Sequence, residues 1–252
     1  MSAFILSTRV DETTYEDACQ YIYSLVEKKQ NGYIVAANVH VVMTAYWNLQ
    51  YRKIVDNAEL VVSDGMPLVL GLKWLGCRTS SRVYGPDLMH FWCKYAASIG
   101  SSIYFYGGSV NTLKRLSKNI KESFPSLKIV GMHSPPFRPL TKEEEDNDLN
   151  HINESGADVV FVGLGCPKQE EWMYRNRDKT SAVMVGVGAA FRFHSGEVNQ
   201  APRWLMKLSM EWLFRLIQEP RRLWSRYLIT NSAFVVLFSI QLIKYHLNRA
   251  IR

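Results

Sequence analysis

The sequence has few cysteines, and they are not spaced as metal ligands or redox pairs. Cys19, Cys77, Cys93 and Cys166 include no CxxC pair, and the six histidines are scattered along the 252 residues. Zinc sites and thiol–disulfide centres need clustered ligands, so neither is predicted. We expect the cysteines to be small buried side chains of a protein in a reducing compartment, and we expect no bound metal.

Other missing patterns disfavour further classes of protein. The amino-terminal stretch MSAFILSTRVDE has no basic region and only a very short apolar run, so it does not predict a signal peptide. The stretches GLGCPKQE (163–170) and GVGAAF (186–191) begin like dinucleotide-binding fingerprints but lack the third glycine. A nicotinamide- or flavin-dependent oxidoreductase is therefore disfavoured, and no cofactor is predicted. No Gly-x-Ser-x-Gly elbow indicates a nucleophilic serine.

The formal net charge of +7 comes entirely from the last fifth of the chain. Residues 203–252 hold nine Lys and Arg against Glu211 and Glu219, and aromatic residues lie among these cations. Cations mixed with aromatic rings suit a membrane interface, a polyphosphate ligand or single-stranded nucleic acid. Since the rest of this segment is apolar, we favour membrane or phosphate binding and expect no nucleic-acid partner.

Residues 227–243, within this segment, carry no charge but include five polar side chains. A membrane-spanning helix needs about 20 mostly apolar residues. We therefore favour a helix that packs on the protein or lies at the membrane interface, and a membrane span stays the alternative.

Short apolar runs alternate with helical patterns along the chain. The runs are YIVAAN (33–38), LVVS (60–63), SIYFYG (102–107), LKIVG (127–131), DVVFVG (158–163) and AVMVGVG (182–188). Helical patterns cover 14–29, 39–57, 86–98, 111–123, 142–154 and 168–177. This alternation predicts an α/β fold, a Rossmann-like parallel sheet with helices on both faces, over residues 1–200. Residues 201–252 are expected to form a helical, basic, membrane-associating appendage.

The polar residues and glycines that follow these runs are candidates for ligand binding. Ligands of open α/β sheets bind beyond the carboxyl ends of the strands. Those ends hold Asn38, Asp64, Gly107, Gly108, Gly163, Gly165, Lys168, Gln169, Gly186 and Gly188. Glycine turns and helix N-termini present backbone N–H groups to anions, so this pattern predicts a ligand that carries phosphate.

Asp64 stands in VVSDGMP, directly after an expected strand and before a glycine. Asp-Gly is common in turns and aspartate is common at helix N-caps, which gives Asp64 a purely structural interpretation. A carboxylate at this edge of the sheet can instead act as a general base on a sugar hydroxyl. The residues alone leave both interpretations open.

The chain contains one Asp-x-Asp stretch, the pattern with which many nucleotide-sugar enzymes hold a metal. It is Asp146-Asn147-Asp148, within EEEDND on an expected helix. We interpret it as a solvated acidic helix face.

Seven stretches form a combined signature. They are NVHVVM (38–43), NAELVVSDGMPLV (57–69), RVYGPDL (82–88), YGGS (106–109), GLGCPKQEEW (163–172), GVGAAFRFHSG (186–196) and APRWLMKLSMEWLFRLIQEPRR (201–222). In this combination and order they resemble the WecG/TagA/CpsF family of bacterial glycosyltransferases, over nearly the whole chain. The resemblance implies a Rossmann-like core, a UDP-sugar donor and a polyprenyl-diphosphate-linked saccharide acceptor. It also implies transfer with inversion, without a metal, by a peripheral enzyme at the cytoplasmic face of the cell membrane, on its inner leaflet.

The resemblance also implies roles for single residues. Asp64 matches the proposed catalytic base of the family, and Asn38, Arg82 and Gln169 match polar active-site residues. The glycines at the strand ends are expected to hold the nucleotide. Family members often have a threonine where this chain has Ala36. The donor sugar therefore stays open among glucose, glucuronate, N-acetylmannosamine and its uronate.

The C-terminal arginines are the expected partners of the diphosphate, because a leaving group of that charge needs cations when no metal is present. Arg215, Arg222 and Arg226 would share one face of a continuous helix, which Pro220 is expected to interrupt. In the resembled family this appendage closes the site. Each arginine has an alternative as a cation that faces solvent or lipid.

Two other classes of function stay open at this point. They are a non-catalytic nucleotide-binding membrane adaptor and a nucleotide-dependent oxidoreductase. The oligomeric state is not predicted, and a homo-oligomer stays open.

Overall fold

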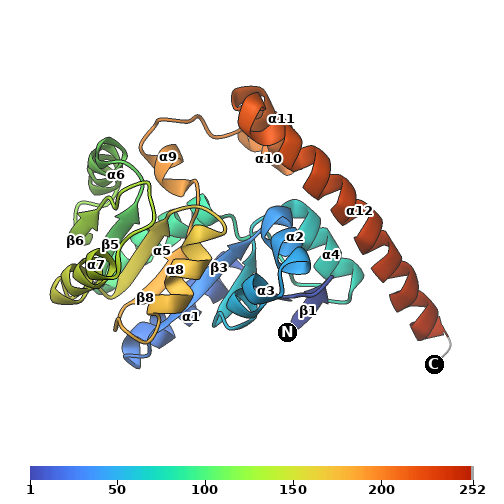
Figure 1. Ribbon diagram of the computed structural model, residues 1–252, viewed down its shortest axis with the longest axis horizontal. Coiled ribbons are helices and arrows are strands. Elements are labelled where there is room, and N and C mark those ends of the chain that lie inside the picture. The colour runs from blue at the N-terminus through green and yellow to red at the C-terminus, as the bar shows by residue number, and fades with distance from the viewer. Residues whose placement is uncertain (251–252) are drawn as a thin grey trace.

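The computed structural model describes residues 1–250, except for the side chains of Lys207, Arg222, Arg226, Arg249 and Ala250. Its centre is a six-stranded parallel sheet with the strand order β4-β3-β8-β7-β5-β6 (Figure 1). The strands are β3 (Gly32–Ala37), β4 (Leu60–Ser63), β5 (Ser102–Gly107), β6 (Lys128–His133), β7 (Val159–Gly163) and β8 (Val183–Gly186). They coincide with the six predicted runs to within two residues, which confirms the predicted α/β, Rossmann-like fold.

Alternate side chains of the strands enter two hydrophobic layers. In β3, Tyr33 and Val35 point to one face of the sheet, Ile34 and Ala36 point to the other, and all four are buried. The first face is covered by α2 (Val39–Trp47), α3 (Leu49–Asp56), α4 (Met66–Trp74), α7 (Lys142–Glu154) and α8 (Lys168–Asn176). The second is covered by α1 (Tyr15–Glu27), α5 (Gly85–Ile99) and α6 (Val110–Ser123). Burial on both faces explains why these strands are continuously apolar.

Local capping decides where several helices begin. Thr14 and Thr141 form capping boxes with Asp17 and Glu144, at the starts of α1 and α7. The prediction of one helix over 39–57 is wrong. Asn48 has extended backbone angles (φ −127°, ψ 107°), and its side chain accepts hydrogen bonds from two amides in the first turn of α3. Asn48 therefore ends α2 and starts α3.

Two strand features differ from the prediction. β6 lies at the edge of the sheet, and its residues alternate between exposed and half-buried, so it is not covered on both faces. An antiparallel hairpin of β1 (Ser2–Ile5) and β2 (Thr8–Asp11) is absent from the sequence prediction. The hairpin packs Ile5 into the core, and its two-residue turn begins at Leu6 with φ 55°. That turn lacks the Asn-Gly or Asp-Gly signal by which short hairpins are recognised.

The acidic stretch of α7 is not a solvated face throughout. Asp148 is buried, accepts a hydrogen bond from the Tyr106 hydroxyl at 2.7 Å and lies 2.9 Å from Nε2 of His133. Asp146, by contrast, is at the surface, 3.8 Å from Nζ of Lys179. The prediction is therefore wrong for Asp148, which ties α7 to β5 and β6.

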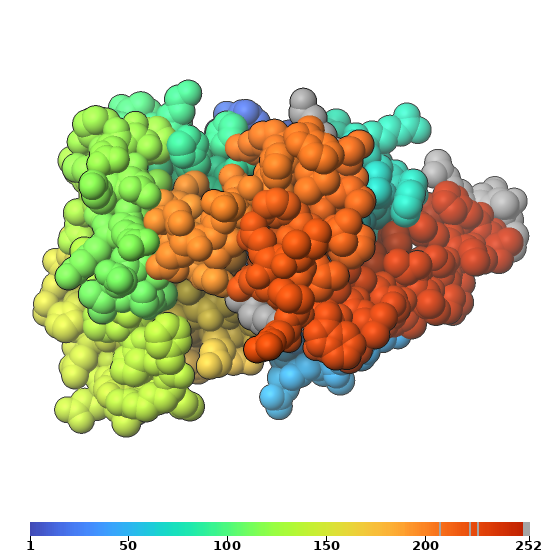
Figure 2. All heavy atoms as spheres, turned by 90° about the horizontal axis from the view of Figure 1, so that it is seen from above, coloured from blue at the N-terminus to red at the C-terminus, as the bar shows by residue number. Residues whose placement is uncertain are grey.

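After β8 the chain forms α9 (Ala190–His194), α10 (Arg203–Lys207), α11 (Glu211–Gln218) and α12 (Pro220–Ala250). The first three lie over the edge where the strands end, and α12 runs down the side of the molecule next to α2 and α4 (Figure 1). Seen from above, residues from about 190 onward cover the middle of the molecule, between α6 in green and α4 in cyan (Figure 2). The predicted helix break at Pro220 is confirmed, since α12 begins there.

One side of α12 packs on the rest of the protein along much of its length. Phe234 and Phe238 are buried, and Phe238 stacks on Trp74 of α4 with ring centroids 6.4 Å apart. The side-chain amide of Gln241 makes two hydrogen bonds of 2.7 Å to the backbone of the β1–β2 hairpin. The hydroxyl of Tyr245 donates to the carbonyl at the end of α4 at 3.1 Å.

The outer side of α12 is apolar and exposed. It presents Trp224, Leu228, Ile229, Val235, Val236, Ile240, Ile243 and Leu247. The 26-residue segment Leu223–Asn248 contains an 18-residue stretch with a mean hydropathy of 1.5, so by length and composition it could cross a membrane. The division into a core of residues 1–200 and an appendage of 201–252 stays a prediction.

Candidate active site

A cleft of about 680 Å³ lies along the carboxyl ends of the strands. Its floor consists of the loops after β4, β3, β8, β7 and β5, and its cover consists of α9, α11 and part of α12. Among the predicted strand-end residues, the cleft is lined by Asn38, Asp64, Gly108, Gly163, Gly165, Gln169, Gly186 and Gly188. Arg82 and Arg215 line it as well. A volume of this size accommodates a cofactor-sized or nucleotide-sized ligand.

Asp64 follows β4, and a backbone amide fixes one of its oxygens. Its Oδ1 accepts a hydrogen bond of 2.7 Å from the N–H of Gly85, the first residue of α5. Burial raises the pKa of Asp64, and the Arg82 guanidinium and the Gly85 amide only partly oppose this shift. Among the residues that the structure describes, no donor bonds to Oδ2 of Asp64. That oxygen can therefore take a proton from a substrate, and the raised pKa suits a general base.

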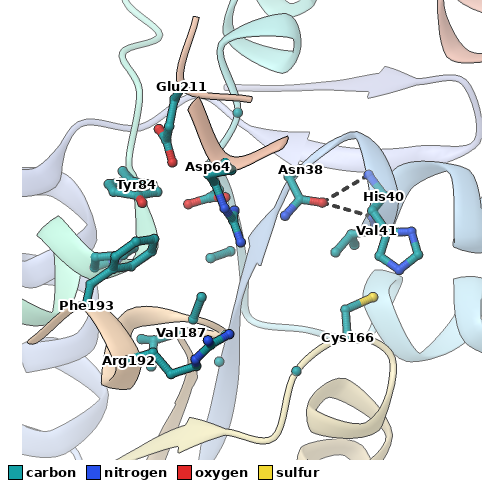
Figure 3. A pocket seen from close by; sticks show the side chains of 18 of the residues that line it. Asn38, His40, Val41, Asp64, Tyr84, Cys166, Val187, Arg192, Phe193 and Glu211 are labelled. Carbon is teal, nitrogen blue, oxygen red and sulfur yellow. Dashed lines mark hydrogen bonds between the residues drawn. The ribbon is translucent and has the colours of Figure 1, made fainter. Parts of the chain in front are cut away.

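Arg82 lies beside Asp64, in the loop before α5. Figure 3 shows Asp64 between Tyr84, Glu211 and Asn38. Its Nε donates to the backbone carbonyl of Asp64 at 2.6 Å, and its Nη2 donates to the carboxylate of Glu211 at 2.5 Å. The guanidinium also lies 4.2 Å from the centre of the Tyr84 ring, close enough for a cation–π contact. Burial disfavours the charge of Arg82, but Asp64 and Glu211 outweigh burial and raise the pKa of Arg82. Arg82 is therefore a fixed cation next to the carboxylate.

Asn38 follows β3 and is the N-cap of α2. Its Oδ1 accepts hydrogen bonds from the amides of His40 at 3.0 Å and Val41 at 3.2 Å. These contacts satisfy two of the free amides in the first turn of α2, so the Asn38 oxygen is occupied as a helix cap. The side-chain nitrogen of Asn38 points away from α2, toward the side of the cleft where Asp64 lies (Figure 3).

Gln169, near the start of α8, is only 3% exposed, and its amide is used inside the protein. Its Nε2 donates to the carboxylate of Glu170 at 2.7 Å, and its Oε1 accepts from the amide of Gly188 at 3.1 Å. Glu170 is fully buried, and burial raises its pKa to about 7. Gln169 therefore fixes the turn after β8 against α8, a structural function that the sequence does not reveal.

The glycines of this region differ in what they contribute. Gly165 and Gly188 have left-handed backbone angles (φ 78° and 55°), and a Cβ on either would meet no described atom within 4 Å. Their turns are therefore accessible from the cleft. Gly107 is instead enclosed, since a Cβ there would lie 2.8 Å from the Gly163 backbone, and Lys168 is exposed at the start of α8. Neither Gly107 nor Lys168 lines the cleft.

Of the three predicted arginines of the C-terminal segment, the structure places the side chain of one. Arg215 of α11 is half-buried and lies 5.8 Å from the centre of the Phe193 ring. Burial disfavours its charge, but Tyr227, Tyr84 and nearby carboxylates outweigh burial and raise the pKa of Arg215. Arg222 and Arg226 belong to α12, but their side chains lie outside the described part of the chain.

Residues 3–248 match the model of the glycosyl transferase WecG/TagA/CpsF family. The chain belongs to this family. A curated relative from Bacillus spizizenii strain W23 is 31% identical over 218 residues, which cover 86% of this chain and 79% of the relative. A second, from Bacillus subtilis strain 168, is 28% identical over 214 residues, which cover 84% and 81%. Both are named N-acetylglucosaminyldiphosphoundecaprenol N-acetyl-beta-D-mannosaminyltransferase.

Membership of this family confirms that the protein is a glycosyltransferase of polysaccharide synthesis. The oxidoreductase and adaptor alternatives are set aside by the same finding.

Several polar residues of the glycosyltransferase cleft are missing from the sequence prediction. Glu211 bonds to Arg82, and Arg192 and Glu197 line the opposite wall. Nη1 of Arg192 donates to Glu219 at 2.9 Å, and the hydroxyl of Thr112 donates to Glu197 at 2.6 Å. Glu211 and Arg192 lie inside two of the seven stretches that carry the family resemblance. Their place in those stretches could have marked them as candidate site residues. Their residue types alone do not indicate that they face the cleft.

Proposed function

We propose that this glycosyltransferase moves a hexose-type sugar from a UDP-sugar to a polyprenyl-diphosphate-linked sugar, with inversion and without a metal. The observation that carries the proposal is Asp64, a half-buried carboxylate with a raised pKa on the wall of one continuous cleft. In a single displacement, Asp64 takes the proton of an acceptor hydroxyl as its oxygen attacks the anomeric carbon. The bond from that carbon to the diphosphate breaks on the opposite face, and UDP leaves.

The two ends of the cleft suit different substrates. The loops after β5, β7 and β8 hold accessible glycine turns, which favour a nucleotide diphosphate. At the other end, α12 contributes Leu223 and Tyr227 to the wall. A lipid-linked acceptor approaches from the membrane, and the apolar surface of α12 makes this the acceptor end. Asp64 follows the edge strand β4 and so lies toward this end, as a base for the acceptor hydroxyl requires.

Cations that line the cleft can stabilise the negative charge of the leaving diphosphate. Arg215 lines the cleft from α11, and we assign it to the departing UDP, together with Arg222 and Arg226. Asn38 and Arg82 orient the two sugars through side-chain nitrogens that face the cleft. Gln169 acts mainly through the turn that it fixes. Gly107 and Lys168 are less favoured as donor contacts because they lie outside the cleft lining.

The names of the two relatives narrow the choice among the candidate donor sugars. Both are named as N-acetylmannosaminyltransferases, which makes N-acetylmannosamine the first candidate. Ala36 lines the cleft and brings no hydroxyl, so glucose, glucuronate and the uronate of N-acetylmannosamine stay candidates.

We also propose that the enzyme is attached to the cytoplasmic face of the membrane through α12. The apolar outer side of α12 belongs to the segment that carries the entire net charge of +7. Anionic lipids of the cytoplasmic leaflet attract such a segment, by about 1 kcal/mol per basic residue near the surface.

A panel of UDP-sugars with a short-chain lipid-diphosphate-sugar acceptor, read by mass spectrometry, tests the proposal. We expect one donor to add one sugar residue to the acceptor and to release UDP, in the presence of a metal chelator. Release of UDP without a lengthened acceptor, or no reaction with any donor of the panel, would contradict it.

A further inference from the structure

Glu211 is a carboxylate in an unusual position. It is the first residue of α11, lies in the wall of the cleft and is only 7% exposed. Carboxylates are rarely buried unless they are paired. Its partner is Arg82, 129 residues earlier in the chain, at 2.5 Å. The pair therefore joins the cover of the cleft to its floor.

The pair restricts where the Arg82 guanidinium can lie. An arginine side chain loses rotamer entropy when it is fixed, so a fixed guanidinium needs several contacts that hold it. Three contacts fix this one: the Asp64 carbonyl at Nε, Glu211 at Nη2 and the face of the Tyr84 ring. Among the described residues, no group accepts from Nη1, so its donors remain for a substrate in the cleft. Loss of Glu211 would leave the guanidinium held by one hydrogen bond and one ring contact.

Anchoring of the C-terminal segment is a poor explanation for this pair. Arg203 of α10 already pairs with Asp87 of α5 at 2.7 Å, outside the cleft lining, and Met206 packs on Tyr84 in a small apolar cluster. A buried ion pair contributes little net stability, because desolvation offsets the attraction between its charges. The distinctive property of the Glu211 pair is its position next to Asp64.

We infer that Glu211 is a positioning residue: from the wall of the cleft it holds the Arg82 guanidinium next to Asp64. This inference rests on the proposed function, in which Asp64 is the base and Arg82 orients the sugars.

A double-mutant cycle on the full chain tests the inference, with transfer as the readout. We expect Glu211→Ala to lower kcat by about 100-fold, the cost of a misplaced catalytic group, with a small change in the KM for the donor. We expect Glu211→Gln, which keeps an oxygen acceptor but loses the charge, to fall between Glu211→Ala and wild type. In an Arg82→Ala background, Glu211→Ala should have no further effect, because the group that it positions is gone. Arg203→Gln, the matched control, should keep wild-type turnover.

Three outcomes would overturn the inference. One is wild-type turnover in Glu211→Ala. Another is an equal loss from Glu211→Ala with and without Arg82, which would make its effect independent of that arginine. The third is a loss of turnover that Glu211→Ala and Arg203→Gln share, with proteolysis of residues 203–250 accelerated to the same extent in both variants. Simple anchoring of the C-terminal segment requires that result. A wild-type enzyme that transfers no sugar would contradict the proposed function itself. The double-mutant cycle is a separate test, because it compares the turnover of each variant with that of an active wild-type enzyme.

Discussion

Asp64 is subject to opposing influences within a few ångströms. Burial favours its protonated form and is the largest of them, while Arg82 and the Gly85 amide favour the carboxylate. Glu211 adds to the upward shift of the pKa, and Arg215 opposes it. The result is a carboxyl group that binds a proton more tightly than an ordinary aspartate, whose pKa is about 3.9. A base of this kind pulls harder on a hydroxyl proton, and its basicity depends on residues from α11.

The pH dependence of transfer follows from this shift. A base is active only when it is ionised, so kcat/KM should fall as the pH drops through the pKa of Asp64, with a midpoint above that of a free aspartate. Asp64→Asn should lower kcat by about 10²–10⁴-fold, the usual contribution of general base catalysis, and should remove this acidic limb. Initial rates across the acidic and neutral range measure both effects, with the melting temperature as the check on folding. Unchanged turnover in Asp64→Asn would exclude it as the base.

At the scale of elements, strands buried on both faces were the most predictable part of the fold. Their continuous apolar runs end in glycine or a polar residue, which marks both the strand and its end. The β1–β2 hairpin could not be found in this way, because its turn begins with Leu6 rather than Asn-Gly. The break at Asn48 was hidden because a single residue separates the ends of α2 and α3.

The same reasoning explains how much of the site was predictable. Parallel strands bring their carboxyl ends to one edge, so the positions of Asn38, Asp64 and the strand-end glycines follow from the topology. The cover of the cleft depends instead on how the C-terminal segment folds back. Glu211 reaches Arg82 across 129 residues of chain, and no local pattern encodes that contact.

The contact of β7 with α9 gives a prediction for stability. A Cβ at Gly163 would lie 2.6 Å from the ring of Phe191, which is only 1% exposed and packed on all sides. Gly163→Ala should therefore lower the free energy of unfolding by about 1–3 kcal/mol through overpacking. Gly65→Ala is the matched control, since its Cβ would meet nothing closer than 3.6 Å, and its effect should stay below about 1 kcal/mol. Denaturant unfolding measures both, and equal stabilities would contradict the packing argument.

At the scale of the whole molecule, the packing of α12 bears on how the enzyme meets the membrane. Contacts with the rest of the protein run from Leu223 to Tyr245, a length of about 33 Å at 1.5 Å per residue. This is close to the thickness of the hydrocarbon layer, about 30 Å. A spanning α12 would carry the β1–β2 hairpin and its exposed edge into lipid, where unpaired backbone groups are too costly. Packed in this way, α12 is expected to lie along the surface of the bilayer with its outer side in the interface, which stays part of the proposal.

Membrane binding and helix docking should therefore depend on opposite sides of α12. Ile229→Asp together with Val236→Asp places charges at positions that are 62% and 59% exposed, so binding to vesicles with anionic lipid should weaken while the melting temperature stays near that of wild type. Phe238→Ala removes a side chain that is only 4% exposed and should instead lower stability by about 3–5 kcal/mol.

Vesicle flotation at low and high salt separates the apolar part of binding from the electrostatic part, since salt weakens only the latter. Wild-type flotation of the double variant would show that this side of α12 does not face lipid. Resistance of the bound wild type to extraction with alkaline carbonate would contradict peripheral attachment.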